Sequence, residues 1–157
     1  MKGEEYSNLR FFESNKIKFG FVQGNMLITV NLAVASLIRV KTLEPVDFVF
    51  DTGSSITMLN RGTFMSLGYM HCRLLGKKEV SDASGNMILL SVYEIPDFIL
   101  VGDIEIVKPE ICVSDKLGVS GSNILGQNII RKFHYCANTI DNFLYFEQHS
   151  RPVFSRF

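Results

Sequence analysis

The chain has 157 residues, of which 46% are hydrophobic, and this length and composition predict a single globular domain with its own core. Its 16 basic and 16 acidic residues cancel to a net charge of zero. The basic residues form only short pairs, Lys77-Lys78 and Arg131-Lys132, so a free-standing nucleic-acid-binding protein is not expected.

Taken in chain order, runs rich in β-branched and aromatic residues predict a series of strands separated by turns. The expected strands cover residues 16–22, 26–40 with a break near 33–36, 46–50, 56–59, 79–80, 87–92, 98–101, 104–107, 111–113 and 143–146. Gln23-Gly24-Asn25 and residues 81–86 have the composition of tight turns. The pattern indicates a mainly β protein whose sheet is closed or sandwich-like.

Two short helices are expected between these strands. Asn60 is a good N-cap for a helix through Leu67, which Gly68 would end. The second helix is expected over residues 127–133, where Ile129, Ile130 and Phe133 would share one face. Residues 114–123 are polar and contain glycine, which favours a loop.

Three cysteines, Cys72, Cys112 and Cys136, occur without any Cys-x-x-Cys spacing. His71 and His134 bring possible ligands close to two of them, but adjacent residues on a strand point to opposite faces. We therefore expect buried or half-buried free thiols, with no metal and no cofactor. Free thiols also favour a reducing compartment, which predicts a cytoplasmic location.

Membrane targeting is not predicted either. Residues 1–5 are polar and acidic, unlike a signal peptide. Residues 20–38 carry no charge and are nearly long enough to span a bilayer. Polar residues such as Gln23, Asn25 and Asn31 would be costly in lipid, so strands are the better interpretation of this segment.

The segment Phe48-Val49-Phe50-Asp51-Thr52-Gly53-Ser54-Ser55 runs an apolar strand directly into a carboxylate surrounded by small hydroxyl-bearing residues. A carboxylate at the end of such a strand needs hydrogen bonds, water or a partner. Hydroxyl groups lie within a few residues of it, and Gly53 allows positive φ and close backbone approach. This arrangement favours a catalytic carboxylate over a surface one.

The Asp51-Thr52-Gly53-Ser54 loop resembles the active-site loop of the aspartic proteases. Two further segments strengthen the resemblance. The stretch Asn123 to Phe133, which contains Ile124-Leu125-Gly126, resembles the segment that ends a lobe of these enzymes, and residues 139–146 resemble their closing strands. The resemblance covers about residues 17 to 147, which we take as the protease domain, between an N-terminal arm (1–16) and a C-terminal tail (148–157).

Only one Asp-Thr-Gly loop is present, whereas pepsin-like enzymes have two lobes and two such loops. A single lobe resembles the retropepsins, the retroviral type of aspartic protease. The resemblance implies a closed retropepsin-like β-barrel that forms a homodimer and hydrolyses peptide bonds between two copies of Asp51.

The resemblance also implies roles for the neighbouring residues. Thr52 would donate a hydrogen bond from its hydroxyl across the dimer axis to the partner loop. Gly53 would let the backbone approach the substrate. Ser54 would donate a hydrogen bond to the Asp51 carboxylate, and Ser55 would complete the loop. Ile124, Leu125 and Gly126 would pack behind the loop. The hairpin Asp82-Ala83-Ser84-Gly85-Asn86 would be the flap that closes over a peptide substrate.

Two other functions remain open from the sequence. The chain could be a non-catalytic retropepsin-like module that dimerises or binds peptides, or a half-enzyme that pairs with a different chain. Leu9-Arg10-Phe11-Phe12 is a candidate self-cleavage site, because bulky apolar residues would flank the bond.

Overall fold

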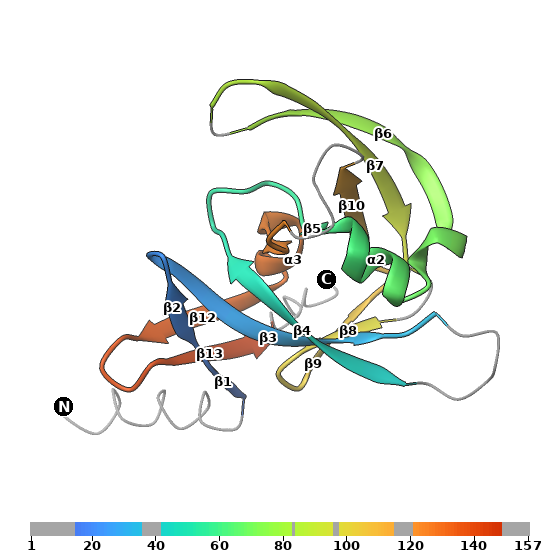
Figure 1. Cartoon of the computed structure of the whole chain (residues 1–157). Coiled ribbons are helices and arrows are strands. Elements are labelled where there is room, and N and C mark those ends of the chain that lie inside the picture. Colours follow the sequence, from blue (N-terminus) through green and yellow to red (C-terminus); the bar gives the residue numbers. More distant parts are fainter. Residues whose placement is uncertain (1–14, 36–41, 83, 96–97, 115–120, 149–157) are drawn as a thin grey trace, which may run out of the picture.

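The computed structural model describes residues 15–35, 42–82, 84–95, 98–114 and 121–148. Nearly all of the expected N-terminal arm, including the candidate self-cleavage site, lies outside these residues, as does all but the first residue of the expected tail. Figure 1 shows a strongly curled sheet with short helices beside it.

The described chain is mainly strand, as predicted. The strands are β1 (Lys16–Lys18), β2 (Gly20–Val22), β3 (Asn25–Ala33), β4 (Leu43–Phe50), β5 (Met58–Leu59), β6 (Arg73–Ser81), β7 (Met87–Glu94), β8 (Phe98–Val101), β9 (Ile104–Val107), β10 (Glu110–Ser114), β11 (Ile124–Leu125), β12 (Phe133–Asn138) and β13 (Phe143–Gln148). The helices are α2 (Arg61–Ser66), the 3-10 turn η1 (Tyr69–His71) and α3 (Gln127–Ile130).

The larger sheet has the strand order β6-β7-β10-β5-β11-β4-β3-β8-β9, with β2 paired to β3. The smaller sheet has the order β1-β13-β12. Among the described residues no pairing joins β6 to β9, so the hydrogen-bonded path stays open. The expected closed barrel is therefore not confirmed, and the sheet is better described as a curled half-barrel.

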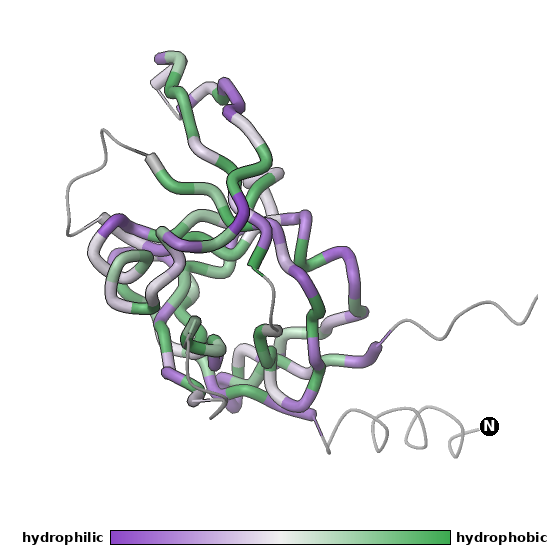
Figure 2. Tube along the Cα trace, turned by 90° about the vertical axis from the view of Figure 1, so that its right-hand side faces the viewer, coloured by the Kyte–Doolittle hydropathy of each residue, from purple (hydrophilic) through white to green (hydrophobic). Residues whose placement is uncertain are grey.

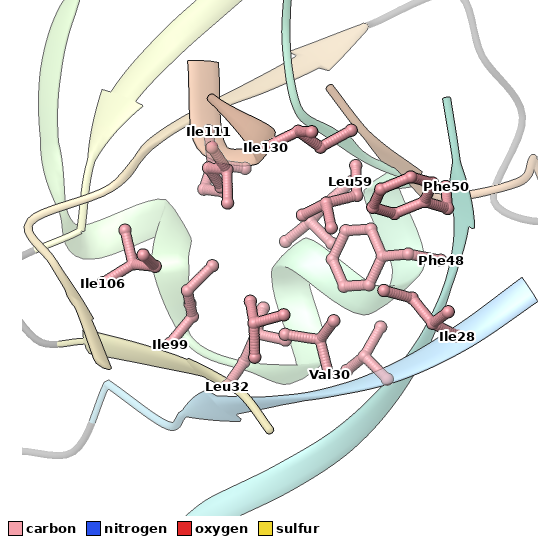
Figure 3. Packing of buried hydrophobic residues seen from close by; sticks show 14 of the residues in the cluster. Ile28, Val30, Leu32, Phe48, Phe50, Leu59, Ile99, Ile106, Ile111 and Ile130 are labelled. Carbon is pink, nitrogen blue, oxygen red and sulfur yellow. The ribbon is translucent and has the colours of Figure 1, made fainter. Parts of the chain in front are cut away.

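The core lies inside this curl because β3 and β4 turn alternate residues toward it. Ile28, Val30 and Leu32 point inward from β3 and are at most 2% exposed. Phe48 and Phe50 are buried and point inward from β4, and Figure 3 shows them packed together with residues of β5, β8, β9, β10 and α3. Figure 2 shows hydrophobic and hydrophilic residues interleaved along the chain, as this alternation requires.

The first helix begins and ends as predicted. The Asn60 side chain accepts a hydrogen bond from the Thr63 amide at 2.8 Å, which caps α2. Gly68 follows the helix at φ 74°, where an added Cβ would also meet the Ala35 carbonyl oxygen. The prediction for the second helix was too long, because α3 ends at Ile130 and Phe133 begins strand β12, which was not predicted.

The three thiols are free among the described residues, with Cys112 buried and Cys72 half-buried as expected. Cys136 is exposed on β12, so the expectation was wrong for this residue. The described residues contain no group of three or more His, Cys, Asp or Glu side chains placed to hold a metal ion. Within the same residues, every helix is too short or too polar to cross a membrane.

Candidate active site

Asp51 lies directly after β4, in the loop that leads to β5. Its amide donates to the Leu125 carbonyl at 3.0 Å, which extends the pairing of β4 and β11 by one step. The carboxylate Oδ1 accepts a hydrogen bond from the Gly53 amide at 2.9 Å. Asp51 is half-buried, whereas Thr52, Gly53 and Ser55 are exposed, so the loop presents its outer surface to solvent.

The structure corrects two details of this loop. Ser54 does not bond to the Asp51 carboxylate; its single hydroxyl hydrogen is donated to the Ile56 carbonyl at 2.8 Å. Gly53 is not among the residues with positive φ. The absence of a side chain at Gly53 instead leaves room for the Asp51 carboxylate, since an added Cβ would lie 3.2 Å from Asp51 Oδ1.

Helix α3 holds the loop from behind through Gln127. The Gln127 amide donates to the Ser54 carbonyl at 2.8 Å, and its side-chain Nε2 donates to the Thr52 carbonyl at 2.9 Å. These bonds fix the loop backbone on both sides of Gly53. They leave the Thr52 side chain exposed on the loop surface.

A second connection runs through Thr57, which is fully buried. Its hydroxyl accepts a hydrogen bond from the Gly126 amide at 3.0 Å and donates to Asn128 Oδ1 at 2.7 Å. Asn128 Nδ2 in turn donates to the Glu110 carbonyl at 3.0 Å. This network joins the loop, α3 and β10, and it satisfies the buried Thr57 hydroxyl as both donor and acceptor.

Sequence reasoning missed Thr57, Gln127 and Asn128. The sequence does contain one signal for Thr57, which is a polar residue inside the apolar run Ile56-Thr57-Met58. A hydroxyl buried in such a run must find a hydrogen-bond partner. That signal indicates a buried hydrogen bond but does not identify the partner, which is 71 residues away in the chain.

We expect Thr57→Val to destabilise the fold by about 2 kcal/mol, because it leaves the Gly126 amide and Asn128 Oδ1 without their partner while the shape is kept. Thr57→Ser keeps the hydroxyl and should cost less. Urea unfolding of both variants measures the difference. Equal stability of the Val and Ser variants would contradict this role of the hydroxyl.

The Ile124-Leu125-Gly126 segment lies behind the loop, where the resemblance placed it. Leu125 is fully buried in the core, and Ile124 is half-buried on the other face of the sheet. Gly126 packs directly on the backbone of Ile56, so that a Cβ added there would overlap the Ile56 carbonyl group. The segment therefore fixes both ends of the loop, through Asp51 and Ile56.

The hairpin expected to be the flap is formed by β6 and β7, and in Figure 1 it arches over the side of the molecule that carries the β4–β5 loop. Its tip is ordered by Asp82. The carboxylate accepts hydrogen bonds from the Ser84 amide at 2.8 Å and the Asn86 amide at 2.9 Å. Gly85 supplies the positive φ, at 83°, and Ala83 lies outside the described residues.

The hydrogen bond from the Asn86 amide, joined by weaker ones from the rest of the tip, lowers the pKa of Asp82. A carboxylate with a lowered pKa stabilises the folded tip above its ordinary pKa and loses that contribution as pH falls through the lowered value. We expect the amide resonances of Ser84 and Asn86 to shift with a midpoint below about 3.9 in an NMR pH titration. A midpoint at or above that value would show that the carboxylate does not hold the tip.

The fold and the loop together define a single lobe of the aspartic protease type. Solved structures with this fold include a retropepsin-like aspartic protease from Rickettsia conorii, with a TM-score of 0.52 and 16% sequence identity. The match covers 83% of this chain and 87% of that chain. At this identity the match establishes a shared fold.

The sequence itself gives the family. The chain belongs to the aspartyl protease family, because the family model described as "Aspartyl protease" matches residues 38–129, more than half of its length. The matched segment contains Asp51, the hairpin and the Ile124-Leu125-Gly126 segment. No curated protein is similar enough in sequence to count as a match.

Proposed function

We propose that the protein is an aspartic endopeptidase that acts as a homodimer and hydrolyses peptide bonds between two copies of Asp51. Family membership and the retropepsin-like fold support the general activity. The proposed protease domain spans residues 17–147, and the pairing of β1 with β13 near the two ends of this range is consistent with one folding unit.

The observation that carries the proposal is the form of the Asp51 loop. Asp51 is half-buried and its carboxylate is held by the Gly53 amide, while Thr52 and Gly53 are exposed and the loop backbone is fixed by Gln127. A fixed loop with an exposed outer surface can meet a second copy of itself. Because this sequence contains one Asp-Thr-Gly loop, the proposal takes the second carboxylate from a second copy of the chain.

The chemistry follows from bringing two carboxylates together. Two carboxyl groups a few ångströms apart cannot both ionise readily, so they share a proton and titrate as a pair. The ionised member acts as general base toward a water molecule, and the protonated member polarises the peptide carbonyl. This mechanism needs no covalent intermediate, and it requires the rate to have a bell-shaped dependence on pH.

In this proposal Thr52 donates its hydroxyl to the partner loop, which would set the distance between the two carboxylates. Its exposure on the loop surface is consistent with this role. Gly53 keeps the loop thin enough for a peptide backbone to approach. The β6–β7 hairpin closes over the bound peptide, with the turn around Asp82 at its tip.

The dimer can be tested by cleavage of an unfolded protein substrate at several enzyme concentrations. The rate per chain should rise with concentration until the dimer is saturated, and it should pass through a maximum between about pH 4 and pH 7. A rate per chain that is constant across the full concentration range, together with a monomeric mass in solution, would contradict the shared site. A chain that binds peptides without cutting them would instead be a binding module.

A further inference from the structure

The sheet has a second face, opposite the core, that starts beside the Asp51 loop. Ile124 of β11 pairs with Val49 of β4 and with Met58 of β5, and all three side chains are half-buried. Their sequence neighbours Phe50, Leu59 and Leu125 point to the core. Asp51 lies two residues beyond Val49, so alternation turns its carboxylate toward the same side as Val49, Met58 and Ile124. We call this the site face.

The site face continues from Met58 across β10 to the hairpin. Cys112 pairs with Met58 and, on its other side, with Val92 of β7. Leu90 lies two residues before Val92 and therefore on the same side, and Lys78 of β6 pairs directly with Leu90. Leu90 and Cys112 are buried, yet neither belongs to the core cluster, which agrees with their position on the site face.

Lys78 brings a positive charge to this mostly apolar face. Burial raises the pKa of the Cys112 thiol to about 11, while the ammonium group of Lys78 opposes that rise and Glu110 adds to it. Lys78 is therefore near enough to act on Cys112. Its side chain is exposed, and among the described residues it has no ion pair with a carboxylate.

Within the described strands β7 and β10, the acidic residues on the same side of the sheet lie far from the hairpin tip. Glu110 is at the start of β10, where its carbonyl contacts Asn128 of α3. Glu94 pairs with Glu110 and has Arg73 within 4.0 Å. Glu79 lies next to Lys78 and thus on the other side of the hairpin. The Asp82 carboxylate at the tip is engaged by the Ser84 and Asn86 amides, which leaves Lys78 as the charged residue that the hairpin strands bring next to the apolar part of the site face.

We propose that Lys78 is a specificity-determining residue, which favours peptide substrates carrying a Glu or Asp side chain at a fixed distance from the bond that is cut. This inference rests on the proposed function. An exposed ammonium group above an apolar surface attracts a carboxylate more than an amide of the same shape. Because two copies of the chain would be related by a twofold axis, the preference should appear on both sides of the cut bond.

The test compares cleavage of peptides that differ only by Glu, Gln or Lys at one position at a time. The parent should cleave the best Glu peptide about three to five times faster than its Gln counterpart, in kcat/KM, and the preference should fall as salt is raised. Lys78→Met keeps the length of the side chain and should remove the preference. Lys77→Met is the matched control, because Lys77 lies next to Lys78 and on the opposite side of the hairpin.

Loss of the Glu preference in Lys78→Met but not in Lys77→Met would support the proposal. A parent without any Glu preference, or variants that behave alike, would overturn it while leaving the peptidase activity established.

If the parent cuts no peptide, binding is measured in place of cleavage. The same peptides carrying a fluorophore are titrated with Asp51→Asn and with Asp51→Asn/Lys78→Met, and binding is followed by fluorescence anisotropy. A Glu preference present only with Lys78 supports the inference even though the proposed function has failed. The absence of any such preference refutes it.

Discussion

Asp51→Asn abolishes peptide cleavage and leaves the fold intact: this is the expected result with the largest effect on activity. An amide can neither act as general base nor share a proton with a second carboxyl group. We expect cleavage to fall by about three orders of magnitude or more. The asparagine side-chain oxygen can still accept the hydrogen bond from the Gly53 amide, so the loop should keep its shape.

The measurement is hydrolysis of an unfolded protein by the purified variant, beside urea unfolding to confirm the fold. Asp103→Asn is the matched control, because Asp103 is an exposed aspartate in the turn between β8 and β9. Full activity in this control and none in Asp51→Asn assigns the chemistry to Asp51. Cleavage by Asp51→Asn at the parent rate would refute the proposed function.

Mixing the parent with an excess of Asp51→Asn tests whether one site uses two chains. The site of a mixed dimer contains only one Asp51 carboxyl group and should be inactive. The parent activity should therefore decline as the variant captures parent chains. An active site complete within one chain would be unaffected by the mixing. This experiment therefore separates a homodimeric enzyme from a lobe that works alone or with a different partner.

The largest expected effect on stability is that of Gly126→Ala. The added methyl group would overlap the carbonyl group of Ile56, and a backbone atom cannot rotate away as a flexible side chain can. We expect a loss of about 3 kcal/mol, typical of overpacking at a rigid position. For a domain of this size, that corresponds to a melting temperature lower by about 6 to 12 °C.

Gly20→Ala is the matched control, because an added Cβ at Gly20 meets no atom within 4 Å and Gly20 is not at positive φ. It should leave stability nearly unchanged. Cleavage should also fall in Gly126→Ala, since the Ile56 carbonyl holds the Ser54 hydroxyl and the Gly126 amide holds the Thr57 hydroxyl, and both contacts position the loop. If the two glycine variants have the same urea midpoint, the close packing of Gly126 on Ile56 does not contribute to the stability of the fold.

Local chemistry explains which features could be predicted from the sequence. Asn60 and Gly68 mark the start and end of α2 because capping and positive φ depend on a few adjacent residues. The hairpin tip is similar, since Asp82, Ser84 and Asn86 bond within one turn. The apolar strand that ends in Asp51-Thr52-Gly53 likewise identifies the candidate site and the family by resemblance.

Features that join distant segments were decided by the tertiary structure. Helix α3 stops at Ile130 because Phe133 is used in β12, which pairs with β13 and turns Phe133 into the core. No short window contains that pairing, so the apolar spacing of residues 127–133 was interpreted as a longer helix. The open edges of the sheet have the same cause, since closure depends on how β6 and β9 are placed relative to each other.

The sequence by itself determined that a carboxylate follows a buried strand, that its neighbours are small, and that the chain has one such loop. The tertiary structure decided how that loop is held. The Ser54 hydroxyl donates to the Ile56 carbonyl and not to the Asp51 carboxylate, and the Thr57 hydroxyl reaches Asn128 across 71 residues of chain. The physical reason is that a buried polar group must be satisfied, but the fold selects its partner from groups far away in the chain.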